Sequence, residues 1–126
     1  MSLEPSLRVL LVEDNEVYRS TLALLLHGRD GIEIVGELAD GRDVADAVGR
    51  LHADVVVMDF RLPGLPGDEA TSALLAARPG TKVVCLTAEA TPDERARVLG
   101  AGAVALVDKG GSTHELVEAI RSGSAR

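Results

Sequence analysis

The chain has 126 residues, which is enough to bury a core and suits one domain. Hydrophobic residues make up 46% of it and charged residues 26%, as in ordinary globular proteins. The net charge of −7 argues against a nucleic-acid-binding surface and is compatible with a site built from carboxylates. No stretch approaches the roughly 20 apolar residues of a membrane-spanning helix, so we expect no membrane span. The single Cys85 lies in an apolar run and cannot form an internal disulfide, which indicates a reduced, cytoplasmic protein.

The chain shows no internal repeat and no break in composition. We expect residues 1–6 to be a disordered leader, residues 7–122 to form one domain, and residues 123–126 to be a tail or the start of a linker.

Five apolar runs predict β-strands, over residues 7–12, 32–37, 54–58, 82–86 and 103–107. Four of these runs are almost unbroken, as is typical of strands that are covered on both faces in a parallel sheet. Glu33 interrupts the second run, so we expect that strand at an edge of the sheet.

The segments between these runs carry helix signals. Thr91–Glu94 is a capping box with proline at the first helical position, and Ser112–Glu115 is a second box. Apolar residues in 44–51 recur at the spacing of one buried helix face. The regular alternation predicts an α/β fold with a five-stranded parallel sheet in the order 2-1-3-4-5, flanked by five helices in the flavodoxin-like, doubly wound arrangement.

Polar residues stand at the carboxyl ends of four of the predicted strands. Glu13 and Asp14 follow the first strand, Asp59 the third, Thr87 the fourth and Lys109 the fifth. Because the carboxyl ends of parallel strands meet at one rim, where open α/β sheets bind ligands, we expect these side chains to converge.

The chemistry of this set is self-consistent. Three crowded carboxylates repel one another, a divalent cation relieves that repulsion, and all-oxygen ligation favours Mg²⁺. An ionised Asp59 beside the metal can attack phosphorus and form an aspartyl phosphate. Lys109 and Thr87 can then stabilise the charge on the phosphoryl oxygens.

Three motifs accompany these residues: the Pro/Gly loop 59–67, the Leu86-Thr87-Ala88 turn, and Ala101-Gly102-Ala103 before the fifth strand. Together with the polar set, they resemble the receiver domains of two-component signalling, over residues 7 to about 122.

The resemblance implies a role for each site residue. Asp14, Asp59 and the Arg61 backbone carbonyl would bind Mg²⁺, and Glu13 would act directly or through water. Asp59 would take a phosphoryl group from the phosphohistidine of a sensor histidine kinase. Such a domain is a phosphoacceptor that assists its own phosphorylation and dephosphorylation, rather than a conventional enzyme.

The resemblance also implies an output. Phosphorylation would change the face formed by the fourth helix, fifth strand and fifth helix, and a homodimer or another partner would read the change. We expect the contact surface around Arg95, Val98, Leu99 and Leu106. The tail resembles receivers that are joined to helix-turn-helix domains, so DNA would be bound only through an output domain outside this chain, in a transcriptional regulator.

The chain departs from the family pattern at three places. Leu106 occupies a position where many receivers have an aromatic residue, and Gly110 replaces the proline that usually follows the lysine. Asp108 puts a carboxylate beside Lys109, and strand alternation predicts that it points to the other face.

Simpler interpretations exist for single residues. Asp14 could be the N-cap of the first helix, Thr87 a turn hydroxyl and Lys109 a surface lysine. His27 is one of three scattered histidines without ligand spacing, and all three are expected at the surface; the others are His52 and His114.

Three other functions would suit a chain of similar topology. Leu106 favours a receiver-shaped interaction module that needs no phosphate. A flavodoxin-like cofactor binder needs a Ser/Thr/Gly phosphate loop, whereas residues 13–16 read Glu-Asp-Asn-Glu. An aspartate-nucleophile phosphohydrolase needs a second acid where Arg61 stands.

Overall fold

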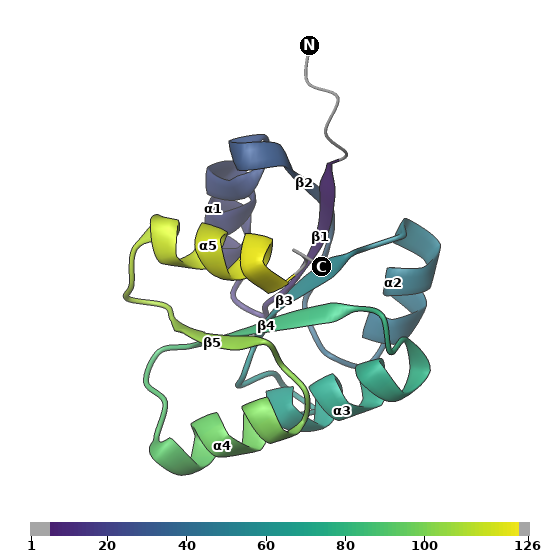
Figure 1. Cartoon of the computed structure of the whole chain (residues 1–126), viewed down its shortest axis with the longest axis vertical. Helices are drawn as coiled ribbons and strands as arrows, with labels where there is room; N and C mark the ends of the chain where they lie inside the picture. Colours follow the sequence, from purple (N-terminus) through teal and green to yellow (C-terminus); the bar gives the residue numbers. More distant parts are fainter. Residues whose placement is uncertain (1–5, 124–126) are drawn as a thin grey trace.

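Five strands pair in parallel in the order β2-β1-β3-β4-β5, as the sequence predicts. The computed structural model describes residues 6–123, and Figure 1 shows the sheet between two layers of helices. The strands are β1 (Leu7–Val12), β2 (Ile32–Leu38), β3 (Val55–Asp59), β4 (Lys82–Thr87) and β5 (Ala105–Asp108). The helices are α1 (Glu16–Leu26), α2 (Val44–Leu51), α3 (Gly67–Ala77), α4 (Pro92–Gly100) and α5 (Thr113–Gly123), with a short 3₁₀ turn, η1 (Arg29–Gly31).

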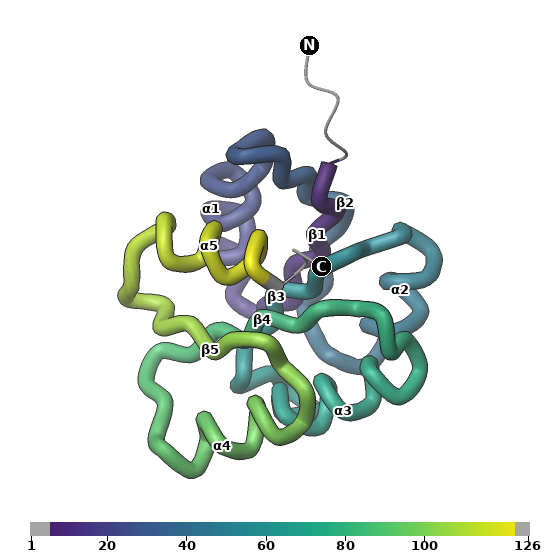
Figure 2. The backbone as a smooth tube through the Cα atoms, in the orientation of Figure 1, coloured from purple at the N-terminus to yellow at the C-terminus, as the bar shows by residue number. Residues whose placement is uncertain are grey.

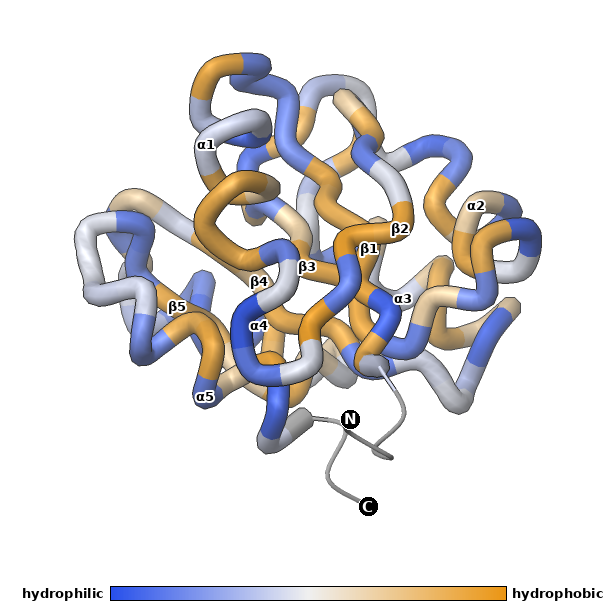
Figure 3. Tube along the Cα trace, turned by 90° about the horizontal axis from the view of Figure 1, so that it is seen from above, coloured by the Kyte–Doolittle hydropathy of each residue, from blue (hydrophilic) through white to orange (hydrophobic). Residues whose placement is uncertain are grey.

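The side chains of the central strands are divided between two cores. Val9 and Val57 face α1 and α5, whereas Leu10 and Val56 face α2, α3 and α4. The hydropathy colours in Figure 3 place the apolar strands in the middle of the molecule, between helices of mixed polarity. Because residues on both faces of β1, β3 and β4 are buried, these strands need unbroken apolar sequences.

The second strand lies at an edge of the sheet, which confirms the expectation drawn from Glu33. The bounds of β1 are as predicted, and the ends of the other four strands lie within one or two residues of the predicted positions. Asp59 and Thr87 are the last residues of β3 and β4, because each still pairs with the neighbouring strand. At β5, Ala103 and Val104 precede the strand, which begins at Ala105.

Two helix starts show how local hydrogen bonds define the elements. Thr91 caps α4 through a complete capping box with Glu94, as predicted. The cap of α1 is Asn15, whose side chain accepts a hydrogen bond from the Tyr18 amide at 2.9 Å. The alternative interpretation of Asp14 as this cap is therefore wrong.

The expected leader, apart from Ser6, and the expected tail, apart from Gly123, lie outside the described residues. Among residues 6–123, no helix is both long and apolar enough to cross a membrane.

Gly67 allows α3 to start directly against the end of β3. A Cβ atom at this position would lie 2.6 Å from the Cα and 2.9 Å from the carbonyl oxygen of Phe60. The Gly67 amide also donates a hydrogen bond to that oxygen at 2.7 Å. This close approach fixes the loop that follows Asp59.

We predict that Gly67→Ala lowers the free energy of unfolding by about 2 kcal/mol, because the backbone of Phe60 cannot yield to the added methyl group. Urea denaturation measures the change. Gly100→Ala is the matched control at the last position of α4, where an added Cβ meets nothing within 4 Å, and we expect it to be neutral or slightly stabilising. Equal midpoints for both variants would contradict the prediction.

Candidate functional site

Lys109 lies between two carboxylates at the carboxyl ends of the strands. Its Nζ atom donates to Glu13 Oε1 at 2.6 Å and to Asp59 Oδ2 at 3.2 Å. Glu13 is 1% exposed and Asp59 is 4% exposed, so both contacts are sheltered from water. A charge-assisted bond in such a place is much stronger than an ion pair at the surface.

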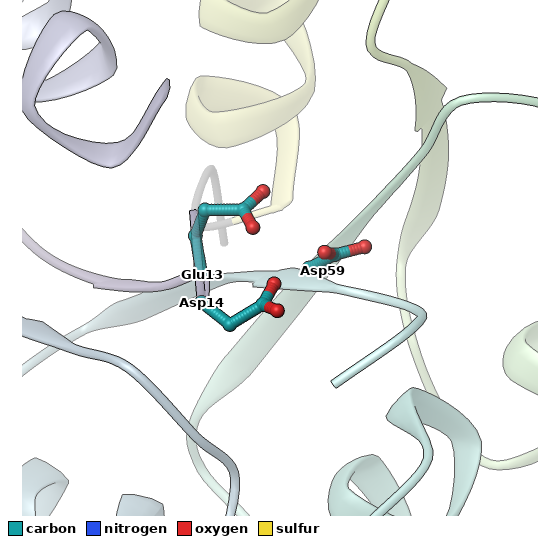
Figure 4. A group of neighbouring side chains, drawn as sticks. All are labelled: Glu13, Asp14 and Asp59. Carbon is teal, nitrogen blue, oxygen red and sulfur yellow. The ribbon is translucent and has the colours of Figure 1, made fainter. Parts of the chain in front are cut away.

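Three carboxylates meet at this rim, as the sequence analysis expects. Figure 4 shows the side chains of Glu13, Asp14 and Asp59 pointing toward the same space between the ends of β1 and β3. One oxygen from each lies within 4.8 Å of the others. Asp14 is exposed and the other two are buried, so the group opens to solvent on the Asp14 side.

Burial and charge shift the pKa values of the central pair. Burial raises the pKa of the Glu13 carboxyl, and the hydrogen bonds from the Asn15 amide and Lys109 only partly offset this effect. Burial alone would lower the pKa of the Lys109 ammonium, but its hydrogen bond to Glu13 and the charge of Asp59 outweigh it and raise that pKa. Lys109 therefore stays positively charged at neutral pH.

Helix α1 holds the turn that carries Glu13. The Asn15 amide donates to Glu13 Oε2 at 3.0 Å. Arg19 reaches back from the helix and donates to the Glu13 carbonyl oxygen at 2.7 Å, while also pairing with Glu37 on β2. These contacts fix the buried carboxylate independently of Lys109. The roles of Asn15 and Arg19 could not be predicted from the sequence, because they depend on the turn geometry.

Thr87 places a buried hydroxyl at the same rim. It is 2% exposed, and its Oγ1 is the one buried side-chain nitrogen or oxygen in residues 6–123 that has no hydrogen-bond partner. Its own carbonyl oxygen accepts from the Lys109 amide at 2.7 Å, which ties the ends of β4 and β5 together. An unpartnered buried hydroxyl costs stability, so it indicates a group available to a ligand.

The loop after β3 links Asp59 to α4. The Arg61 amide donates to Asp59 Oδ1 at 3.1 Å, and the Arg61 guanidinium pairs with Glu94 Oε2 at 2.8 Å. Glu94 is the capping-box residue of α4, so one chain of contacts joins the carboxylate to the start of that helix.

The residues at the rim suit a magnesium ion. Their donor set consists of carboxylate oxygens, and the exposed Asp14 leaves room for the water that Mg²⁺ retains. Glu13 and Asp59 are already shared with Lys109, so their charge is partly balanced without a metal.

A family model described as the response regulator receiver domain matches residues 9–121. The chain belongs to this family. This receiver domain is 37% identical over 115 residues to the response regulator GacA of Pseudomonas viridiflava, a match that covers 91% of this chain and 54% of the relative. It is 36% identical over 116 residues to the response regulator UvrY of Escherichia coli (strain K12). That match covers 92% of this chain and 53% of the relative.

A solved structure shares the fold closely. The crystal structure of a LuxR-family two-component response regulator from Aurantimonas sp. superposes with a TM-score of 0.90 and 30% identity, over 95% of this chain and 86% of the other. The receiver domain spans about half the length of the curated relatives that it matches.

The expected contact surface of the receiver domain needs correction. Val98 is the fully buried residue of α4, and Leu106 on β5 is 9% exposed and packs in the same core. Both side chains point into the sandwich because they fill the space between α4 and β5. Arg95 and Leu99 are exposed, as expected.

The predictions for Asp108 and for the three histidines are confirmed. Asp108 is exposed and accepts a hydrogen bond from the Gly110 amide, so it points away from the carboxylates that Lys109 contacts. His27, His52 and His114 are exposed, as predicted.

We predict that Lys109→Met lowers the free energy of unfolding by about 3 kcal/mol at pH 8, because Glu13 is left buried without its cation. The loss should be smaller at pH 5. The folded-state pKa of Glu13 already lies above its usual 4.5 and rises further without Lys109, so stability is lost as pH rises from 4.5 through the raised value.

Urea denaturation in EDTA at both pH values measures this difference. Glu13→Gln combined with Lys109→Met is the control, because it removes the titrating carboxyl and should abolish the extra loss at pH 8. An equal loss at the two pH values in Lys109→Met alone would rule out the explanation.

Proposed function

We propose that this receiver domain is a phosphorylation switch that accepts a phosphoryl group on Asp59 from a sensor histidine kinase, with Mg²⁺. The contact of Lys109 with both Glu13 and Asp59 is the observation that carries the proposal. A partly buried cation shared between a nucleophile and a second carboxylate can follow the charge when the nucleophile is modified.

Asp14, Asp59 and the backbone carbonyl of Arg61 would hold the Mg²⁺, and Glu13 would act directly or through water. When bound, the ion supplies positive charge that offsets the charge on the phosphoryl oxygens. The carboxylate cluster supports this assignment.

Asp59 acts as the nucleophile. One of its oxygens bonds to phosphorus while the bond from phosphorus to the imidazole nitrogen of the donor breaks, and the electron pair stays on that nitrogen. Lys109 then donates to a phosphoryl oxygen in place of the modified carboxylate. The free hydroxyl of Thr87 donates to another, which gives this buried group its missing partner.

The proposed output is a change in the face formed by α4, β5 and α5. The Arg61–Glu94 ion pair and the Thr87 carbonyl connect the rim to α4 and β5. A homodimer or another partner would read this change, and Arg95 and Leu99 remain candidates for contact. Only a partner that binds the two states with different affinity can respond to it.

The relatives that extend beyond the matched region are named response regulators. We propose that this domain serves a transcriptional regulator in the cytoplasm, and that DNA is bound through an output domain and not by residues 6–123.

A phosphate-independent interaction module is the second candidate. Leu106 favours it, because this aliphatic side chain is packed in the core against α4 and provides no aromatic ring that could turn inward. The intact rim of Asp59, Thr87 and Lys109 counts against it.

The first experiment is to measure the intact mass after incubation with acetyl phosphate and Mg²⁺. We expect one labile phosphoryl adduct, and none with EDTA or in Asp59→Asn, because the nucleophile or its cation is then missing. A folded protein that binds Mg²⁺ but forms no adduct would reject the switch and favour the interaction module.

Thr87→Val separates the function of this residue from its packing. We predict that it leaves stability unchanged or raises it by about 1 kcal/mol, because a buried unpartnered hydroxyl is removed, while the adduct forms about tenfold more slowly. Thr71→Val is the matched control: its hydroxyl donates to the Gly67 carbonyl oxygen, so stability should fall by about 1 kcal/mol without a similar loss of rate. Wild-type adduct formation by Thr87→Val would contradict the assigned role.

A further inference from the structure

Tyr18 contacts the site from α1, and the mechanism above gives it no role. The Lys109 Nζ atom lies 4.7 Å from the centre of the Tyr18 ring, within the range of a cation–π interaction. The ring is only partly exposed, and burial raises the pKa of its hydroxyl group, so it presents a neutral aromatic surface to the ammonium. Lys109 is thus surrounded by Glu13, Asp59 and Tyr18.

The two residues beyond Lys109 offer no side chain that could hold its ammonium. They are Gly110 and Gly111, and their amides both donate hydrogen bonds to Asp108. Figure 2 shows this segment as the open loop between β5 and α5. A lysine side chain on four methylene groups needs contacts at its tip to hold one position.

Four residues form a closed circuit of contacts around that tip. Lys109 donates to one oxygen of Glu13, and the Asn15 amide donates to the other. The Asn15 side chain accepts from the Tyr18 amide, and the Tyr18 ring returns to Lys109. The helix cap therefore sets the position of the ring relative to the same carboxylate that holds the ammonium.

We propose that Tyr18 is a positioning residue for phosphoryl transfer, and that its ring holds the Lys109 ammonium against Asp59. The assignment rests on the proposed function of Asp59. When the phosphoryl group draws Lys109 toward its oxygens, the ammonium moves relative to the ring, so the environment of Tyr18 changes with phosphorylation.

The chain itself supplies a reporter for this change. It has one tyrosine and no tryptophan, so its intrinsic fluorescence comes from Tyr18. We expect Tyr18 emission to change when acetyl phosphate is added with Mg²⁺, and to stay constant upon the same addition in Asp59→Asn. Constant emission in a wild-type protein that carries the phosphoryl adduct would overturn the proposal.

Rates of adduct formation test the positioning directly. Tyr18→Leu should slow the reaction by about threefold to tenfold, whereas Tyr18→Phe, which keeps the ring, should restore most of the rate. Ala23→Gly is the control: it weakens α1 at a partly buried position without contacting Lys109, and should leave the rate unchanged. A wild-type rate in Tyr18→Leu, or an equal loss in Ala23→Gly, would refute a positioning role.

A double-mutant cycle keeps this test separate from the proposed function. In the unphosphorylated protein, the urea midpoint shifts of Tyr18→Leu and Lys109→Met should not add, because the two residues share one contact. If the wild type forms no adduct, the phosphoacceptor function fails, and non-additive shifts still support the Tyr18–Lys109 contact. Additive shifts would overturn it.

Discussion

The ion pair between the buried Glu13 and the partly buried Lys109 is the interaction on which the site depends. A carboxylate with 1% exposure is costly unless a cation stands beside it, and here the cation comes from Lys109, the residue directly after β5. The pairing fixes the distance between the ends of β1 and β5 across the two strands between them, β3 and β4, and Asp59 is the last residue of β3. The ammonium that offsets the cost of burying the Glu13 carboxylate is thereby also placed beside Asp59.

The surrounding contacts confine this charge to one arrangement. Arg19 and Asn15 hold the Glu13 turn, and the Thr87 carbonyl oxygen accepts a hydrogen bond from the Lys109 backbone amide. Two polar groups are left available at the rim, the exposed carboxylate of Asp14 and the free hydroxyl of Thr87. The charged pair is held in one position, whereas the Asp14 carboxylate and the Thr87 hydroxyl can still bind a ligand. Such a site is preorganised for an incoming anion and its counterion.

The fold and the residues at the rim could be predicted from the sequence, because both follow from strong periodic signals. Unbroken apolar runs gave the strands, and the carboxyl ends of parallel strands must share one edge. The details could not be predicted where neighbours in space decide them. Asn15 rather than Asp14 caps α1 because the turn points Asp14 toward Asp59. Val98 and Leu106 are buried because α4 lies against β5, which no local pattern specifies.

The site unites residues that are far apart in the chain. Glu13 and Lys109 are separated by 96 positions, and Asp59 lies about midway between them. A contact of such long range closes a long loop, and the entropy cost of closing it is offset only as the intervening chain becomes ordered. A chain still emerging from the ribosome has the three acids before it has the lysine. Chemistry that needs Lys109 beside Asp59 is therefore restricted to molecules that have completed the fold. Nascent and partly folded molecules lack this pair of residues in contact.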